Sequence, residues 1–228
     1  MQLSRRLSLI ASMVDRTGVV ADVGTDHGYI PIYLVGEGIA QAAIAMDINS
    51  GPLARAEINI KNNGLEDKIS TRLSDGVKEL ESGEADAIVV AGMGGQLIIK
   101  ILEDGEEVFR NAGQIILSPH SDIEMVRRYL CEMGYNICDE SMVIDDNKYY
   151  NVIKVLNNYK SCDYSSDEDF VYGKRLLDKR DAVLKKFLDK EEITTNDILK
   201  NIKTHNTEKT AYLSKKLDII RKCKGFYT

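Results

Sequence analysis

The stretch ADVGTDHGYIP, residues 21–31, decides the fold of this chain. It follows a short apolar run and precedes a helical pattern, so we expect a strand, a tight turn and a helix in that order. Gly24 and Gly28 let the backbone turn sharply and approach a ligand closely. Asp26 stands between them, where turns of this kind often carry another glycine. The stretch therefore predicts a ligand-binding turn that presents a carboxylate.

The spacing of the two glycines separates two kinds of nucleotide ligand. Turns that bind NAD read GxGxxG, so that the N-terminus of the following helix holds the pyrophosphate. Here the spacing is GxxxG, and the carboxylate of Asp26 would repel two phosphates. A ligand with a sulfonium cation and an amino group would be tolerated or attracted. The turn therefore favours S-adenosylmethionine as cofactor over NAD.

Polar or glycine-rich turns also follow the next apolar runs. Asp47 stands 23 residues after Gly24, where an acidic side chain can accept hydrogen bonds from two ribose hydroxyls. One such turn alone is more often only a turn or a helix cap, but several in order at successive strand ends predict a cofactor site. The candidate cofactor-binding residues are Asp22, Gly24, Thr25, Asp26, His27, Gly28, Asp47, Ile48, Asp75, Gly76, Gly92, Met93 and Gly94.

Short apolar runs alternate with helical patterns over the first 157 residues. Such runs suit strands buried on both faces of a parallel sheet, joined by right-handed crossovers. The predicted strands are 19–24, 42–48, 69–73, 85–92 and 114–118, and the predicted helices are 29–37, 52–62, 95–103 and 123–133. Segments 135–144 and 149–156 form an antiparallel hairpin, because DDNK leaves room only for a turn. The fold class is α/β, with a mostly parallel Rossmann-like sheet that ends in an antiparallel hairpin, as in class I methyltransferases.

The composition changes after Asn157, where NNYKSCDYSSDED is polar and resembles a linker. Ser166 and Asp169 predict a helix start with a side-chain cap and an acidic first turn. Apolar stripes then predict two coiled-coil-like helices, one reaching Leu188 and one opened by Thr195, joined by KEEITT. We therefore expect a cofactor-binding methyltransferase domain, residues 1–158, and an antiparallel helical hairpin arm, residues 159–228.

The net charge of −6 is unevenly divided, with +4 from Tyr159 onward and −10 before it. A basic arm beside an acidic body predicts contact with a polyanion, although a solvated lysine-rich face is the commoner alternative. The candidate RNA-contacting residues are Lys174, Arg175, Lys179, Arg180, Lys185 and Lys186, with Arg5, Arg6, Arg127 and Arg128 extending the track.

Other signals argue against membranes and metals. No apolar run approaches the roughly 20 residues that cross a bilayer, and MQLSRRLSLIASMVDRTG predicts an amphipathic helix rather than a secretion signal. The cysteines form no CxxC pair and the three histidines are scattered, so we expect no metal site. Four unpaired thiols without an export signal indicate a reducing cytoplasm. The oligomeric state is left open, with a monomer favoured.

Five segments together are specific enough to name a family. LSRRL, VADVGTDHGYIPIYLVGEGIAQAAIAMDINSGPLARA, NNGLEDKISTRLSDG, AIVVAGMGGQLIIKIL and DDNKYYNVIKV resemble the bacterial tRNA (adenine-22-N1)-methyltransferase family. The tail is similar to that family in kind only. The resemblance implies methyl transfer from S-adenosylmethionine to N1 of an adenine in the D-arm region of tRNA. It also implies that the helical arm helps to hold the tRNA.

Asp26 is the candidate catalytic residue. N1 of neutral adenine already has a lone pair, so attack needs no prior deprotonation, and positive charge develops on the ring. We expect the Asp26 carboxylate to accept the N6 hydrogen and to stabilise that charge, as a base or as a fixed charge. Its alternative role is an N-cap of the following helix. GMGG after the fourth strand, in place of an Asn/Asp-Pro-Pro-aromatic stretch, disfavours reaction at the exocyclic amine.

Three aromatic side chains near the predicted turns have open roles. His27 is expected either to contact the carboxylate of the cofactor or to point to solvent. His120, after the fifth strand, is a candidate for contact with the target base, with an ordinary loop histidine as the alternative. Tyr29 is a candidate for stacking on a flipped base, with a core aromatic as the alternative.

Other functions stay open at this stage. The chain could methylate another RNA or a protein, or it could be an adaptor that binds S-adenosylmethionine and RNA without catalysis. An NAD-dependent oxidoreductase is disfavoured by the charge of Asp26. Nucleoside analysis after methylation of total small RNA separates these alternatives.

Overall fold

The computed structural model describes residues 2–157, 162–201 and 207–227. The chain divides into two compact units, residues 1–162 and 163–228. The predicted boundary between residues 158 and 159 lies outside the described residues. So does His205, which the apolar stripe of the tail predicts as a packed helix residue.

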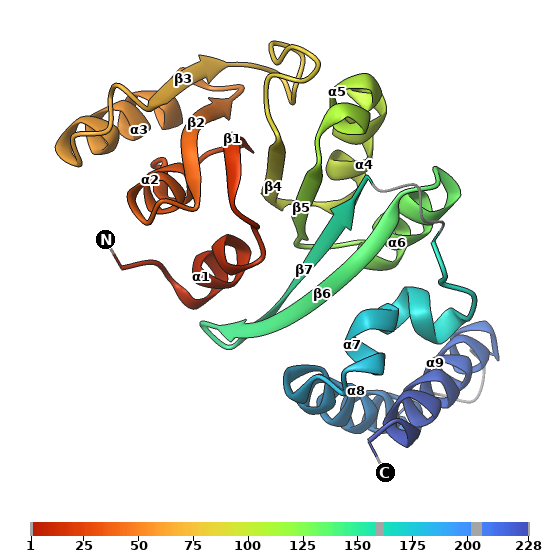
Figure 1. Cartoon of the computed structure of the whole chain (residues 1–228). Helices are drawn as coiled ribbons and strands as arrows, with labels where there is room; N and C mark the ends of the chain where they lie inside the picture. The colour runs from red at the N-terminus through yellow and green to blue at the C-terminus, as the bar shows by residue number, and fades with distance from the viewer. Residues whose placement is uncertain (1, 158–161, 202–206, 228) are drawn as a thin grey trace. The chain divides into compact units, whose positions relative to one another are not determined.

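The first unit contains a seven-stranded sheet with the order β3-β2-β1-β4-β5-β7-β6 (Figure 1). Strands β1 to β5 pair in parallel, and β7 pairs antiparallel with both β5 and β6. The strands are β1 Thr17–Val23, β2 Ala40–Asp47, β3 Ile69–Leu73, β4 Ala87–Met93, β5 Gln114–Pro119, β6 Asn136–Asp145 and β7 Lys148–Leu156. The predicted Rossmann-like sheet with an antiparallel terminal hairpin is confirmed.

Helices cover both faces of this sheet because most side chains of its central strands are apolar and buried (Figure 1). One face packs against α1 Arg5–Ser12, α2 Tyr29–Gly36 and α3 Ser50–Asn62, whose buried side chains share one core with the strands. The other face carries α4 Gly95–Asp104, α5 Glu106–Asn111 and α6 Ile123–Glu132. All the predicted helices of this unit are present, and only the short α5 was not predicted. The order of strands reverses between β1 and β4, which is the switch point where such sheets bind ligands.

A buried ion pair joins α6 to the hairpin. Arg127 Nε donates to Glu140 Oε1 at 2.7 Å, and both side chains are only 1% exposed. The prediction that Arg127 belongs to a surface track for RNA is therefore wrong. The cause is the apolar face of α6, which turns Arg127 inward together with the buried Val126 and Leu130.

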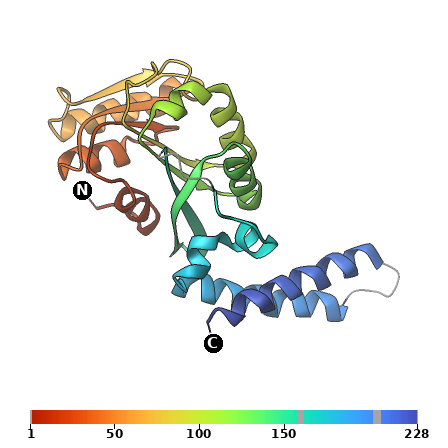
Figure 2. The same ribbon diagram turned by 45° about the vertical axis from the view of Figure 1, so that its right-hand side comes forward.

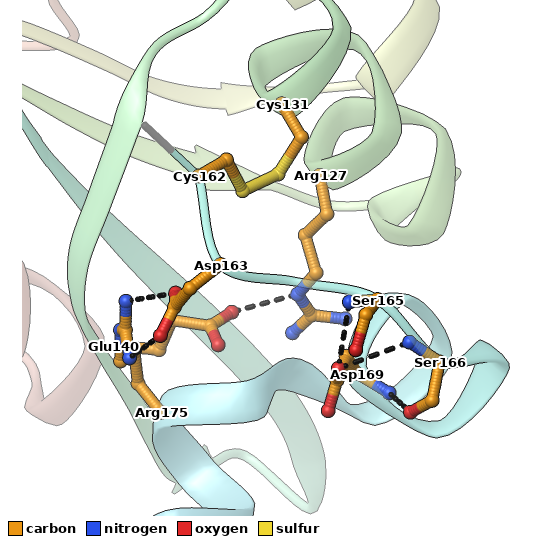
Figure 3. The surroundings of a disulfide bond; sticks show 9 residues. All are labelled: Arg127, Cys131, Glu140, Cys162, Asp163, Ser165, Ser166, Asp169 and Arg175. Atoms are coloured by element: carbon orange, nitrogen blue, oxygen red, sulfur yellow. Dashed lines mark hydrogen bonds and ion pairs between the residues drawn. A yellow bond between two sulfur atoms is a disulfide. The ribbon is translucent and has the colours of Figure 1, made fainter. Parts of the chain in front are cut away.

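The expectation of four unpaired thiols is also wrong. Cys131 and Cys162 form a disulfide bond, whereas Cys138 and Cys223 are free (Figure 3). The sequence does not indicate this pair, because the two cysteines are separated by 31 positions along the chain. In the described parts of the chain, no helix is long and apolar enough to span a membrane. Nor do those parts gather three metal-binding side chains in one place.

The second unit begins with the predicted helix start. The Ser166 hydroxyl accepts from the backbone N–H of Asp169, whose carboxylate accepts from the N–H groups of Ser165 and Ser166 (Figure 3). This reciprocal capping satisfies N–H groups that a helix end leaves free. A π-helix η1, Asp169–Gly173, and a short helix α7, Lys174–Asp178, follow.

The two long helices of this unit are displaced from their predicted positions. They are α8 Ala182–Asn201 and α9 Thr207–Gly225, so the KEEITT stretch is helical and not a connection. The break comes earlier, at Arg180, whose φ of 52° ends α7, and Asp181 then caps α8. The prediction of one helix up to Leu188 and a second from Thr195 is therefore wrong in its boundaries.

Helices α8 and α9 lie side by side as an antiparallel pair (Figure 2). Ion pairs join them: Lys224 lies 2.6 Å from Asp189 and 2.8 Å from Glu192, and Lys216 pairs with Glu191. Leu184, Leu188, Leu217 and Ile220 supply buried apolar side chains. The predicted helical hairpin is thus present, with a different connection.

Candidate active site

The glycine turn after β1 is built by left-handed backbone. Gly24, His27 and Gly28 have φ values of 76°, 60° and 68°. The N–H groups of Gly24 and Thr25 both donate to the Met46 carbonyl at 2.8 Å, which fixes the turn against β2. A Cβ at Gly28 would lie 3.2 Å from that of Ala56, so a glycine also lets α3 approach. The turn is therefore shaped by both neighbouring elements.

Asp26 lies at the tip of this turn. Its side chain is 74% exposed and lies 3.6 Å from Arg55 Nη2 and 3.4 Å from His27 Nε2. The alternative role as a helix cap is wrong, because the N-cap of α2 is Gly28, which makes no side-chain cap. The Asp26 carboxylate thus caps no helix, and it is accessible to a substrate.

The two aromatic rings next to Asp26 stack on each other. The His27 and Tyr29 rings have centroids 5.2 Å apart and an interplanar angle of 9°. The His27 carbonyl accepts from Asn59 Nδ2 at 2.9 Å, which anchors its strained backbone. Tyr29 is 36% exposed, so the alternative of a core aromatic is wrong.

Two carboxylates meet at the ends of β1 and β2. Asp22 is only 5% exposed, and burial raises the pKa of its carboxyl to about 6. The Thr25 hydroxyl opposes this rise, and the neighbouring Asp47 carboxylate adds to it. Asp47 also accepts from the backbone N–H of Asn49 at 2.7 Å, and Ile48 beside it is 60% exposed. A buried carboxyl beside a second acid provides a place for a cation.

The turn after β3 is held by Ser74. Its buried hydroxyl donates to the Gly76 carbonyl at 2.9 Å and accepts from the N–H of Glu79 at 3.2 Å. This arrangement leaves Asp75 exposed, where it pairs with Lys78. Gly76 has a φ of 64° and packs closely on Ile101. Asp75 therefore stands at the rim of the candidate site.

The GMGG turn, residues 92–95, ends β4. Its register with β5 shifts between Ala91 and Met93, and Gly92 has a φ of 82°, so the strand bulges there. The side chain of Met93 lies against Gly24, where an added Cβ would overlap the Met93 methyl group. Gly94 precedes α4 as its N-cap residue. The first and fourth strand ends are therefore in direct contact.

The structure brings some predicted residues together and leaves others apart. Asp22 with Asp47, and Gly24 with Met93, form the centre. Asp26 pairs with Arg55 of another segment, whereas Asp75 pairs with Lys78 of its own turn. Arg55 was not predicted, because nothing in its helical pattern connects it with a turn some 30 residues earlier. Nor does the sequence indicate that Arg6, near the start of the chain, lies close to Gly92, where an added Cβ would be 3.5 Å from Arg6 Nη1.

These residues fit the cofactor that the sequence favours. The glycines leave a cradle that side chains would fill, and the central acids suit a ligand with an ammonium or sulfonium group. A diphosphate at the same place would meet Asp22, Asp26 and Asp47. The fold and the site together define a Rossmann-like methyltransferase, and a methyltransferase domain family model matches residues 3–153.

Comparison with known proteins identifies the family more closely. The tRNA (adenine(22)-N(1))-methyltransferase of Bacillus subtilis (strain 168) is 32% identical over 229 residues, which cover 97% of this chain and 96% of that protein. The chain belongs to the tRNA (adenine(22)-N(1))-methyltransferase family, and the resemblance of its motifs is confirmed.

Two solved structures add the cofactor. Streptococcus pneumoniae Sp1610 in complex with S-adenosyl-L-methionine is 31% identical, with a TM-score of 0.88 over 97% of this chain and 99% of that one. The M. capricolum TrmK in complex with the cofactor product S-adenosyl-homocysteine is 28% identical, with a TM-score of 0.87 over 99% of both chains. The prediction of S-adenosylmethionine as cofactor is confirmed at the level of the family.

Proposed function

We propose that this protein transfers the methyl group of S-adenosylmethionine to N1 of adenine 22 in tRNA. The observation that carries the proposal is the similarity to the B. subtilis enzyme over 97% of the chain, which includes the candidate site and the helical hairpin. The same similarity disfavours an oxidoreductase. The protein acts in the cytoplasm, where its tRNA substrate is found, and as a monomer.

The cofactor supplies an electrophilic methyl group on a sulfonium. Asp22, Thr25, Asp47, Ile48 and Asp75 would hold it, with His27 at the side and the glycines of both turns leaving it room. Burial disfavours the charged form of the Asp22 carboxyl. An ammonium or sulfonium group beside it would give the carboxylate an opposite charge and so favour the charged form.

Asp26 is the catalytic residue of this proposal. The lone pair of adenine N1 forms the new N–C bond, the methyl–sulfur bond breaks, and positive charge appears on the ring. An exposed carboxylate at the tip of the turn can accept the N6 hydrogen and stabilise that charge. Afterwards it can take the N6 proton if the product leaves neutral. Arg55 keeps the carboxylate oriented until the substrate arrives.

The arm contributes contacts to the tRNA backbone. At the start of α8, Arg180, Lys185 and Lys186 are exposed, and among the described residues no carboxylate pairs with Arg180 or Lys186. By contrast, Lys216, Lys222 and Lys224 already face acids of their own unit. Cations without acidic partners gain most from phosphate, so this end of α8 is the proposed contact.

Nucleoside analysis tests the proposed reaction. The purified protein, S-adenosylmethionine and an unmodified tRNA transcript with adenine 22 should yield 1-methyladenosine. A transcript with guanine 22 should yield none. N6-methyladenosine as the product, or product with both transcripts, would contradict the proposal. Tight binding of cofactor and tRNA without any product would support the adaptor instead.

A further inference from the structure

Three side chains from distant segments meet beside the GMGG turn. Arg6 Nη1 lies 3.1 Å from His120 Nε2, and the Arg6 guanidinium carbon lies 5.5 Å from the centre of the Tyr150 ring. The rings of His120 and Tyr150 have centroids 5.4 Å apart and are tilted by 60°. We call these three residues the Arg6 cluster. They come from α1, from the end of β5 and from β7.

The Arg6 cluster and the cofactor residues lie on opposite sides of the same turn. The His120 N–H donates to the Met93 carbonyl at 2.8 Å, and a Cβ at Gly92 would lie 3.5 Å from Arg6 Nη1. The cofactor residues come from β1, β2, β3 and β4, whereas the cluster comes from the β5 and β7 side of β4. The Arg6 cluster therefore borders the GMGG turn on the side away from β1 and β2.

The chemistry of the cluster suits a neutral aromatic base. Partial burial, followed by the positive charges of Arg6 and Lys148, lowers the pKa of His120, which favours the neutral imidazole. A guanidinium has no acceptor, so His120 Nε2 must accept from Arg6 and the ring hydrogen stays on Nδ1. The exposed His120 and the half-buried Tyr150 thus offer ring faces, and Arg6 offers a cation.

The cluster is also held in place by the hairpin. The backbone N–H of Arg6 donates to Asp145 Oδ2 at 3.0 Å, which ties the start of α1 to the end of β6. Tyr150 pairs with Val143 across the same hairpin. A surface with several anchors of this kind is preorganised for a ligand.

We propose that His120 and Tyr150 hold the ring of the target adenine beside the GMGG turn and that Arg6 binds a phosphate of the same nucleotide. This inference rests on the proposed function. Aromatic side chains hold flipped or unpaired bases by stacking, and guanidinium groups bind phosphate through fixed donors. The antiparallel hairpin thereby becomes part of the substrate site.

A tRNA with 2-aminopurine at position 22 reports on the base directly. With S-adenosyl-homocysteine bound, the wild-type protein should change its fluorescence as the base leaves its stack and enters the site. His120→Ala and Tyr150→Leu should each lose most of this change and lower kcat/KM for unlabelled tRNA by about 5- to 150-fold, the range of one base–aromatic stack. Tyr150→Phe should recover most of the loss. The affinity for S-adenosyl-homocysteine should stay at the wild-type value in all three.

Arg6→Ala should raise KM for tRNA and weaken its dependence on salt. Arg16→Ala is the matched control, because Arg16 is exposed and directly precedes β1. It therefore lies at the amino-terminal ends of the parallel strands, whereas His120 follows the carboxyl end of β5. If both aromatic variants bind S-adenosyl-homocysteine yet keep the fluorescence change and kcat/KM, the inference is wrong. If Tyr150→Leu fails to fold, the exposed His120 carries the test alone. A wild-type protein that makes no 1-methyladenosine contradicts the proposed function instead.

Discussion

Burying the carboxyl of Asp22 at the end of a central strand costs free energy when the group is charged. It is only 5% exposed, and the nearby Asp47 carboxylate adds to the effect of burial on its pKa. A cationic ligand removes this penalty, because the charged carboxylate then has a partner. Cofactor binding should therefore depend on pH near the raised pKa.

The affinity for S-adenosylmethionine should fall as pH falls through about 6, because Asp22 becomes protonated there in the free protein. The loss should approach about tenfold per pH unit at lower pH. Asp22→Asn should bind weakly and without this dependence. Isothermal titration calorimetry between pH 5 and pH 8 measures the affinity of both proteins for S-adenosylmethionine. Wild-type affinity that stays level down to pH 5 would contradict the assigned role.

The same residue should lower the stability of the free protein. Because folding raises the pKa of Asp22, the folded state binds more protons than the unfolded state between about pH 4 and pH 6. Its contribution to the free energy of unfolding is therefore largest at low pH and is lost as pH rises through about 6. Without cofactor at pH 7.5, Asp22→Asn should gain up to about 3 kcal/mol in urea unfolding. A variant less stable than wild type at that pH would refute this.

Asp26 gives a different expectation, because it is exposed and caps no helix. Asp26→Ala and Asp26→Asn should both lower kcat by about 10²- to 10³-fold. The free energy of unfolding should stay within about 0.5 kcal/mol of wild type. Single-turnover kinetics at saturating cofactor and tRNA measures the effect. Full activity in Asp26→Asn would show that the charge is not needed.

At the scale of the residue, the sequence predicts which side chains follow each strand but not what they face. Asp47 and Gly92 could be placed because parallel strands bring their carboxyl ends to one edge. The pairing of Asp26 with Arg55, and of Arg6 with His120 across 114 residues, depends on packing that no local pattern records.

Among the elements, the turn after β1 and the end of β4 act together. Gly24→Ala should cost roughly 1–2 kcal/mol of stability from its left-handed backbone and should also displace Met93 from the site. Gly38→Ala is the matched control, because Gly38 has a similar φ of 67° and no atoms within 4 Å of an added Cβ. The two variants should unfold at similar urea concentrations, but only Gly24→Ala should lose affinity for S-adenosylmethionine. If Gly24→Ala and Gly38→Ala had equal affinities for S-adenosylmethionine, Gly24 would not belong to the cofactor site.

The helices of the second unit show why polar stretches mislead. The polar composition of KEEITT predicts a connection, yet Lys190, Glu191 and Glu192 are good helix formers. Within α8 the Thr194 hydroxyl donates to the Lys190 carbonyl. Thr195 is predicted as a helix start, but it lies in the interior of the α8 sequence and its side chain is buried. The sequence did contain the correct signal in Asp181, which accepts from the N–H groups of Val183 and Leu184. Capping residues were therefore better guides than polarity.

For the whole molecule, the distribution of paired charges predicts how tRNA binding responds to salt. The slope of log Kd against log salt should fall by about one for Arg180→Ala and for Lys186→Ala, because each loses a phosphate contact. Lys216→Ala should change it much less, since that ammonium already faces Glu191. Filter binding over a range of potassium chloride concentrations measures these slopes. Equal slopes in all three would exclude the start of α8 as the contact.

The sheet order also has a consequence for synthesis on the ribosome. Strand β7 lies between β5 and β6, although it is the last of the three to be made. Until residues 148–156 leave the exit tunnel, the N–H and C=O groups along one side of β5 have no partner, and β6 has no strand on which to pair. A nascent chain halted before Lys148 would expose this unpaired strand edge to other nascent chains on the same messenger RNA. The last strand of the unit thus protects the growing chain as well as completing the fold.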